Sequence, residues 1–315
     1  MVATALVLGL LVLAGTVRAD NAAAVKAIEK MGGKVTRDDN RPGKPVLGVD
    51  LSQKQITDAG LKELKEFKNL QELNLRSTAV TDAGLKELKE LKNLQTLDLT
   101  LTAVTDTGLK ELKHFKRLQS LRLLATQVTD DELKELKELR KLQDLSLSDT
   151  RVTDAGLVAL KELKGLKSLG LCGTQVTGEG LEELKGLDQL QDLNLFASKV
   201  TDAGLKGLKR LKRLKSLDLS NTGVSDAGLK ELKVLKNLQD LSLSSTAITD
   251  AGMKELKELK GLEWLVLHGT KVTDTGLKEL KDLKSLQYLE VNHTRVTDAG
   301  VKELQAALPG LKINR

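Results

Sequence analysis

Apolar and polar residues repeat along the chain with a period of 24 residues. Thr57-Asp58 returns at every 24th position up to Thr297-Asp298 without an insertion or deletion, and only two of these dipeptides differ, by Gly178 and Ser225. A full repeat reads TDAGLKELKELKNLQTLDLTLTAV at residues 81–104, and nearly every repeat contains the string LxxLxLxxTxV. Such regular spacing predicts a solenoid, in which each unit buries its apolar face against its neighbours.

Each repeat has two halves with different hydrophobic periods. Leucines alternate with polar residues at residues 73–75, which predicts a short strand with one buried face. In the other half Thr57 or Asp58 can cap a helix, whose apolar residues then share one face for about two turns. The three-residue leucine spacing that follows drifts around an α-helix, so this helix should end near residue 66. A pure β-helix is the alternative.

The alternation of strand and helix predicts an α/β solenoid with a curved stack of units. Strands in a parallel sheet lie about 4.8 Å apart, whereas packed helices need about 8 to 10 Å. The helices must therefore lie further apart than the strands, which curves the stack. We expect the parallel sheet on the concave side and short helices on the convex side.

The repeats resemble leucine-rich repeats, specifically those of bacterial secreted proteins in which a TDAGL segment opens the convex helix. This resemblance covers about residues 46–313 and implies a leucine-rich-repeat horseshoe. Thr78 and its equivalents then take the place where the family usually has Asn. The TDxGL element is also similar to the repeat region of F-box proteins, but those repeats are longer and contain cysteines, and no F-box-like segment precedes the array here.

Three segments are expected along the chain. Residues 1–19 read as a signal peptide, because residues 2–17 are apolar and uncharged and Ala19 suits signal peptidase. An uncleaved membrane anchor is the alternative. Residues 20–45 read as an N-terminal cap, with a short amphipathic helix at 22–31 and a polar loop leading to a first strand at 46–51. Residues 46–313 form the array of eleven TDxGL units, and residues 306–313 make a truncated C-terminal cap with a last edge strand.

Composition excludes several classes of function. The chain has 315 residues and only five aromatic residues, too few for a stacking platform for single-stranded nucleic acid. Lys and Arg number 50 and Asp and Glu 44, and because Lys and Glu alternate, no basic stripe for phosphates is visible. Three His and one Cys make a zinc site improbable. We therefore expect no cofactor, no metal and no nucleic-acid partner.

Two columns of residues beside the strand leucines should face solvent on the sheet. Both are mostly small and polar, and in the first of them Asp and Ser alternate from Asp144 to Asp240. Acids two strands apart are separated by about 9.6 Å, which favours neither a calcium cage nor a close acid pair. No base accompanies the Thr and Ser residues of the repeat. The sequence thus predicts no catalytic residue, and the protein is expected not to be an enzyme.

Two groups of residues depart from this polar pattern and are the candidate binding site. The first gathers aromatic, His and acidic side chains on adjacent repeats, namely Trp264, Tyr288, His268, His293 and Glu290. Exposed aromatics on a rigid sheet are favoured interface anchors. Their alternative role is to cover the last strands of the array. The second group lies at the rim where strands meet loops, and forms an apolar patch or a self-covered loop: Leu101, Leu124, Cys172 and Phe196.

The functional expectation is a non-enzymatic binding scaffold, secreted or exported to the periplasm, cell envelope or exterior. Its concave face would recognise a protein partner or a glycan, without membrane insertion after signal cleavage. A structural or envelope-associated spacer with no specific ligand is the alternative. A substrate-recognition subunit of a ubiquitin-ligase-like assembly is a remote one.

Two repeats depart from the TDxGL element itself. Gly178 replaces the Asp in one repeat, and Glu132 replaces the Gly in another. If the Asp caps its own helix, the helix after Thr177 should be the least protected in hydrogen exchange.

Overall fold

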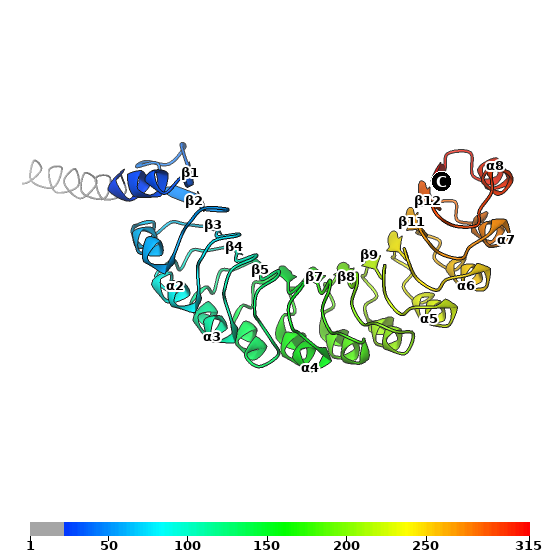
Figure 1. Ribbon diagram of the computed structural model, residues 1–315, viewed down its shortest axis with the longest axis horizontal. Helices are drawn as coiled ribbons and strands as arrows, with labels where there is room; N and C mark the ends of the chain where they lie inside the picture. The colour runs from blue at the N-terminus through cyan, green and yellow to red at the C-terminus, as the bar shows by residue number, and fades with distance from the viewer. Residues whose placement is uncertain (1–21) are drawn as a thin grey trace, which may run out of the picture. The chain divides into compact units, whose positions relative to one another are not determined.

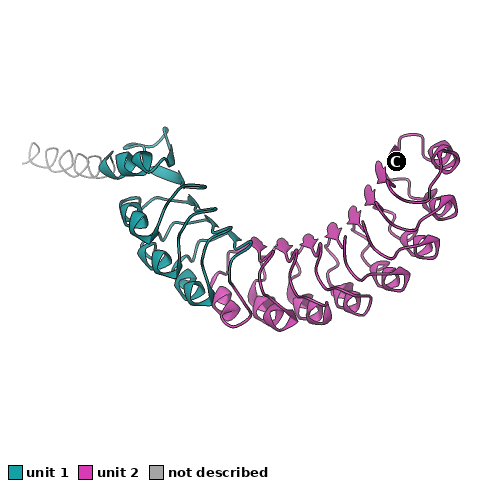
Figure 2. Ribbon diagram, in the orientation of Figure 1, with its two compact units in different colours: residues 1–127 teal, residues 128–315 magenta. Residues whose placement is uncertain are grey.

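The computed structural model describes residues 22–315 and divides the chain into two compact units, residues 1–127 and 128–315 (Figure 2). Each unit is a solenoid segment with strands along one side and short helices along the other (Figure 1). The expected signal peptide lies outside the described residues. No helix among residues 22–315 is long and apolar enough to cross a membrane.

Unit 1 begins with a helix over residues 22–30 and a β-hairpin. The strand β1 pairs antiparallel with β2, and β2 to β5 are parallel and consecutive. The elements after the first helix are β1 (Lys34–Arg37), β2 (Val46–Asp50), η1 (Asp58–Glu66), β3 (Glu72–Asn74), α2 (Asp82–Glu87), β4 (Thr96–Asp98), α3 (Asp106–Leu109), η2 (Lys110–His114) and β5 (Ser120–Arg122), where η denotes a 3₁₀ helix. The strand β1 lies in the segment that the sequence predicts to be a polar loop, so the N-terminal cap contains one strand more than expected.

Unit 2 contains only parallel strands, each paired in register with the next along the chain. Its elements are η3 (Leu133–Glu138), β6 (Asp144–Ser146), α4 (Asp154–Leu157), η4 (Val158–Glu162), β7 (Ser168–Gly170), η5 (Glu179–Gly186), β8 (Asp192–Asn194), η6 (Gly204–Arg210), β9 (Ser216–Asp218), α5 (Asp226–Leu232), β10 (Asp240–Ser242), α6 (Asp250–Leu256), β11 (Trp264–Val266), α7 (Asp274–Leu277), η7 (Lys278–Leu280), β12 (Tyr288–Glu290), α8 (Asp298–Ala307) and β13 (Lys312–Asn314). The strand β13 is the expected last edge strand.

The apolar positions of every repeat form one continuous core within each unit. In the first repeat the residues at positions 61, 64, 67, 70, 73, 75 and 80 are all at most 2% exposed. The residues between the two strand leucines point away from this core, and all of them except Asp98, at 7%, are partly or fully exposed. The predicted strand register is therefore confirmed, and the two solvent-facing columns exist as expected.

Many helical segments are 3₁₀ helices, whereas the sequence pattern predicts α-helical turns. Backbone N–H groups of Phe67 and Leu70 donate to the carbonyls three residues earlier, at 3.0 and 2.9 Å. A 3₁₀ helix has three residues per turn, so leucines spaced by three stay on one face. The spacing that would drift around an α-helix is thus the natural period of the helix that forms.

The Asp and Gly of the TDxGL element join neighbouring repeats. Asp58 accepts hydrogen bonds from the backbone N–H and the hydroxyl of Thr81 in the next repeat, at 2.8 and 2.7 Å. A Cβ added at Gly84 would overlap the same Asp58 carboxylate. The Asp position therefore bonds forward to the next repeat, and the capping acceptor is the hydroxyl of Thr81, which receives the N–H of Ala83. The carboxylate pair with the next Thr or Ser recurs at Asp82, Asp130, Asp154, Asp202, Asp226, Asp250 and Asp274.

The loop after each strand is held in the same conformation. The hydroxyl of Thr78 donates to the Leu75 carbonyl at 2.7 Å, and its equivalents do likewise, which is the structural role expected for this column. The residue before each of them is left-handed, with Gly173 and Gly269 there in two repeats and non-glycine residues, such as Leu101 and His293, in the others. Side chains at the rim of the sheet therefore project from a fixed turn.

Candidate functional site

The strands of unit 2 present one exposed sheet face, which we call the unit 2 face. It consists of the first and third residues of strands β6 to β13. Register pairing places the first residues side by side in the row Asp144, Ser168, Asp192, Ser216, Asp240, Trp264, Tyr288 and Lys312. The third residues form a second row of mostly small polar side chains. The two aromatic side chains are the largest departure on this face.

Trp264 and Tyr288 stack on one another in the first row. Their ring centroids are 4.7 Å apart with an interplanar angle of 30°, and Trp264 is 48% exposed. The Tyr288 hydroxyl donates to Glu290 Oε2 at 3.2 Å, which fixes the ring. Two stacked rings on paired strands lose little conformational freedom on binding, so they can serve as a rigid anchor.

His268 and His293 extend this group towards the rim. Their rings meet edge to face with centroids 4.9 Å apart, and His268 Nδ1 lies 3.8 Å from Glu290 Oε1, an ion pair when the imidazole is protonated. Trp264, Tyr288, Glu290, His268 and His293 are thus linked from one to the next, and we call them the aromatic–histidine cluster. The structure brings together all five residues that the sequence analysis grouped.

Asn292 beside this cluster was missed from the sequence. Its side-chain Oδ1 is buried and is the one such atom in residues 22–315 without a hydrogen-bond partner. Its backbone carbonyl accepts from Gly269, in the turn that follows His268. A buried acceptor without a donor carries a cost of about 1–3 kcal/mol. Only its place in the rim column, which holds Ser, Thr and other residues in other repeats, could have drawn attention to it.

The apolar rim residues form two separate pairs. In unit 1 Leu101 donates its N–H to the Leu124 carbonyl at 2.9 Å; Leu101 is 49% exposed and Leu124 is half-buried. In unit 2 Gly173, which follows Cys172, donates to the Phe196 carbonyl at 2.8 Å, and Phe196 is 41% exposed.

Neither apolar pair is part of the aromatic–histidine cluster. Phe196 follows β8, and three strand spacings of about 4.8 Å separate β8 from β11. Leu124 belongs to unit 1. Burial, followed by the charges of Asp149 and Asp218, raises the pKa of the Cys172 thiol, so this group is not a poised nucleophile.

The first row also carries a series of acids. Burial, with the charge of Asp144, raises the pKa of Asp192, and burial, with the charges of Glu263 and Asp192, raises that of Asp240. These carboxylates repel one another electrostatically along the sheet but do not converge on a common point. Within residues 22–315 no group of three or more His, Cys, Asp or Glu side chains is arranged to hold a metal ion.

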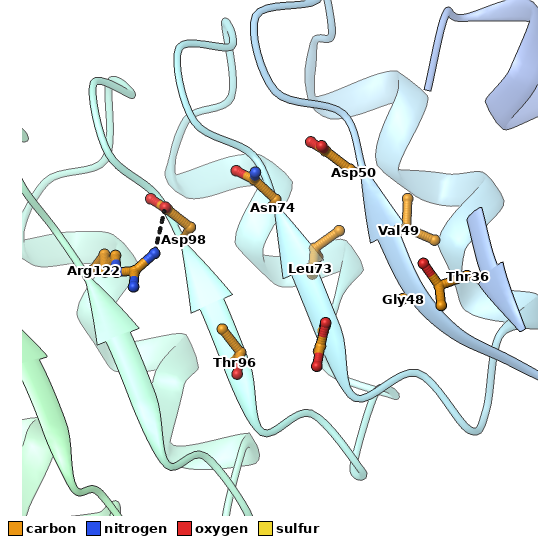
Figure 3. A pocket seen from close by; sticks show the side chains of 10 residues that line it. Thr36, Gly48, Val49, Asp50, Leu73, Asn74, Thr96, Asp98 and Arg122 are labelled. Atoms are coloured by element: carbon orange, nitrogen blue, oxygen red, sulfur yellow. Dashed lines mark hydrogen bonds and ion pairs between the residues drawn. The ribbon is translucent and has the colours of Figure 1, made fainter. Parts of the chain in front are cut away.

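Unit 1 has a hollow of its own on its sheet, with a volume of about 260 Å³ (Figure 3). Arg122 Nη1 lies 3.5 Å from Asp98 Oδ2, and Asp98 Oδ1 accepts the N–H of Thr100 at 2.9 Å. Its polar groups are therefore largely engaged with one another and with the loops. It was not predicted, because Thr36 on the unforeseen strand β1 forms one wall. Its lining is Thr36, Gly48, Val49, Asp50, Glu72, Leu73, Asn74, Thr96, Asp98 and Arg122.

Comparison with known proteins agrees with this architecture. The leucine-rich-repeat family model matches six segments of the chain: residues 68–89, 90–113, 138–161, 212–233, 234–257 and 282–304. No sequence match was found among proteins with curated descriptions. The chain therefore contains leucine-rich repeats, and its fold is the leucine-rich-repeat solenoid.

Solved structures of bacterial proteins share the fold. An internalin from Listeria monocytogenes has a TM-score of 0.63 at 19% identity, with 94% of each chain covered. A leucine-rich-repeat protein of Leptospira interrogans has a TM-score of 0.58 at 26% identity, covering 81% of this chain and 74% of that one. Internalin C2 of Listeria monocytogenes has a TM-score of 0.53 at 28% identity, covering 68% and 84%. Proteins with this fold are typically protein-binding scaffolds and generally not enzymes.

Proposed function

We propose that this chain is a secreted or exported scaffold that binds a protein partner through the unit 2 face, with the aromatic–histidine cluster as its anchor. The observation that carries the proposal is the exposure of Trp264, at 48%, on a stacked and hydrogen-bonded pair. Large exposed aromatics are rare in this chain and are typical of binding hot spots. The TDxGL repeats, which resemble those of bacterial secreted proteins, support export.

The position of the pair favours binding over capping of the array. Strand β11 is paired on both sides, with β10 and β12, and β12 is paired with β13. Trp264 and Tyr288 therefore cover no open sheet edge. Two further residues are proposed as secondary contacts for a partner: Phe196 in unit 2 and Leu124 in unit 1.

The test is crosslinking and capture of partners from the native host, with the parent protein and three variants. We expect Trp264→Ala and Tyr288→Ala each to weaken capture by about 1–3 kcal/mol while leaving thermal unfolding nearly unchanged. Val158→Ala is the matched control, because Val158 is 42% exposed but lies on η4, on the helical side. A loss of stability above about 2 kcal/mol with unchanged capture would instead support a spacer whose aromatics only pack the array.

Export has a separate test. If residues 1–19 are a signal peptide, mass spectrometry of the exported protein will give Asp20 as its first residue. Membrane-bound protein that retains Met1 would contradict cleavage.

A further inference from the structure

The unit 2 face is acidic, although the whole chain has a net charge of +6. Acids on or beside the face outnumber bases, with Asp144, Asp192, Asp218, Asp240, Glu263 and Glu290 against Lys167, Lys215 and Lys312. In the first row the small side chains of Ser168 and Ser216 separate the three Asp residues. Each of these carboxylates is therefore open to an incoming group from solvent.

The acids of the first row are evenly spaced. Asp144, Asp192 and Asp240 lie on every second strand, which separates their backbones by about 9.6 Å. In unit 2 the strands lie on the inner side of a curve (Figure 2), so inward-pointing side chains converge slightly. The carboxylates thus present a repeat of a little under 10 Å.

One extended backbone conformation matches this repeat. A polyproline II helix rises about 3.1 Å per residue with three residues per turn, so every third side chain shares a face at about 9.3 Å. A β-strand puts every second side chain on one face, at about 6.6 or 13 Å, and its third residue points the opposite way. The acid row therefore fits a three-residue repeat of cations.

The same repeat continues onto the aromatic pair. Two strands beyond Asp240 lies Tyr288, with Trp264 stacked against it. A fourth cation in the series would thus reach the exposed ring face, where a guanidinium is attracted by the aromatic electrons. Aromatic anchor and acid row are parts of one continuous surface.

We propose that the unit 2 face binds an extended partner segment in the polyproline II conformation that carries Arg or Lys at every third residue. Charge complementarity and matched spacing define this occupant, and Trp264 anchors one end of it. The inference rests on the proposed function, because it names the chemistry of the partner at the same face.

Two synthetic peptides of equal composition test the spacing. The first is (Pro-Pro-Arg)₄, and the second has four Arg and eight Pro with Arg spacings of four, two and four. In the second peptide only two Arg residues can share a face of the polyproline II helix. Binding is followed by the fluorescence of Trp264, the single tryptophan of the chain. We expect the regular peptide to bind about tenfold more tightly, since two of its four cation contacts are lost in the other.

Protein variants test the position. Asp192→Asn and Asp240→Asn should each weaken the regular peptide about two- to fivefold, as expected for exposed ion pairs. Asp188→Asn is the matched control, since Asp188 is exposed but lies before β8 outside the two rows, and it should change affinity less than twofold.

Three results would overturn the inference. Equal affinity of both peptides would show unspecific attraction of charge. If neither Asp192→Asn nor Asp240→Asn weakened peptide binding, the cations would bind elsewhere. Absence of peptide binding, with host capture still dependent on Trp264, would overturn the extended basic segment and leave the proposed function standing. Loss of Trp264-dependent capture would count against the proposed function itself.

Discussion

The contact between the Asp of one TDxGL element and the Thr and Gly of the next, which we call the joint between repeats, can be broken at Asp226. Its carboxylate accepts the backbone N–H of Thr249 at 2.8 Å and the Thr249 hydroxyl at 2.6 Å. Hydrogen bonds to a charged group contribute about 1.5–3 kcal/mol each, and partial exposure of Asp226 lets water replace part of this. We therefore expect Asp226→Ala to lower the free energy of unfolding by about 2–3 kcal/mol.

The same carboxylate explains the glycine of the next repeat. A Cβ added at Gly252 would overlap Asp226 Oδ1 and lie 3.0 Å from Leu229 Cδ1. Gly252→Ala should therefore displace the carboxylate and cost about 2–3 kcal/mol in the intact protein. In the Asp226→Ala background the overlap with the carboxylate is gone and only the 3.0 Å approach to Leu229 Cδ1 remains. Alanine favours a helix over glycine by about 1 kcal/mol, which offsets this remaining crowding, so the change should be nearly neutral. The two substitutions are expected to be strongly non-additive.

Urea denaturation of the two single variants, the double variant and the parent protein measures this coupling. The double variant should be about 2 kcal/mol more stable than the sum of the single losses predicts. Asp282→Ala, at an exposed site outside the joint, is the control and should stay within about 0.5 kcal/mol. Additive losses to within about 0.5 kcal/mol would refute the coupling of the Asp and Gly positions.

Three further predictions follow from burial, hydrogen bonding and charge. Leu145→Ala should cost about 2–5 kcal/mol, because Leu145 is 2% exposed, whereas Ser146→Ala should stay within about 0.5 kcal/mol; equal losses in urea would contradict the register. The first turn of η6 should exchange amide hydrogens faster than that of α5, because Gly178 offers no carboxylate to Thr201, whose N–H bonds instead to the Thr177 carbonyl at 3.2 Å; equal protection would show that the carboxylate is dispensable. The raised pKa of Asp192 means that its ionised form disfavours folding above that pKa, so Asp192→Asn should be slightly more stable at neutral pH. That advantage should vanish as pH falls through the carboxyl pKa, and a variant less stable at neutral pH would contradict it.

The expected weak point moves by one repeat once the direction of the Asp bonds is known. If each Asp capped its own helix, the weak point would lie after Thr177. The structure gives Asp154 hydrogen bonds to the N–H groups of Thr177, Gly178 and Gly180 at the start of η5. Burial opposes ionisation of Asp154, but these bonds outweigh it and hold its pKa below the usual value. The carboxylate that is missing at Gly178 therefore leaves the start of the following repeat, at Thr201, without its acceptor.

The strands and core could be predicted because leucine position alone decides them. Each residue faces either the stacked interior or solvent, and the 24-residue period shows leucine at the same interior positions in every repeat. The 3₁₀ segments could not be predicted with equal ease. Both helix types bury Leu61 and Leu64, and only the backbone bonds of Phe67 and Leu70 distinguish them. Strand β1 was missed because its side chains are mostly exposed, so it shows no hydrophobic alternation.

The candidate site also has a part that the sequence predicts and a part that it does not. The aromatic–histidine cluster could be predicted from the sequence because residues 24 positions apart become neighbours on paired strands. The hollow of unit 1 could not, since it depends on Thr36, which lies outside the repeat and meets Gly48 only through antiparallel pairing. The buried oxygen of Asn292 likewise depends on the packing of a single loop.

The chemistry of the joint explains why departures on the sheet face carry functional information. The leucines form the core, the Thr hydroxyls hold the loops, and the Asp and Gly of each TDxGL element connect successive units. None of these roles uses the first residue of a strand, so substitutions there leave the supports of the fold intact. A small polar residue suffices at that position, as at Ser168 and Ser216. The presence of an exposed Trp264 stacked on Tyr288, beyond an even series of acids, is therefore unexplained by folding and supports the proposed partner on this face.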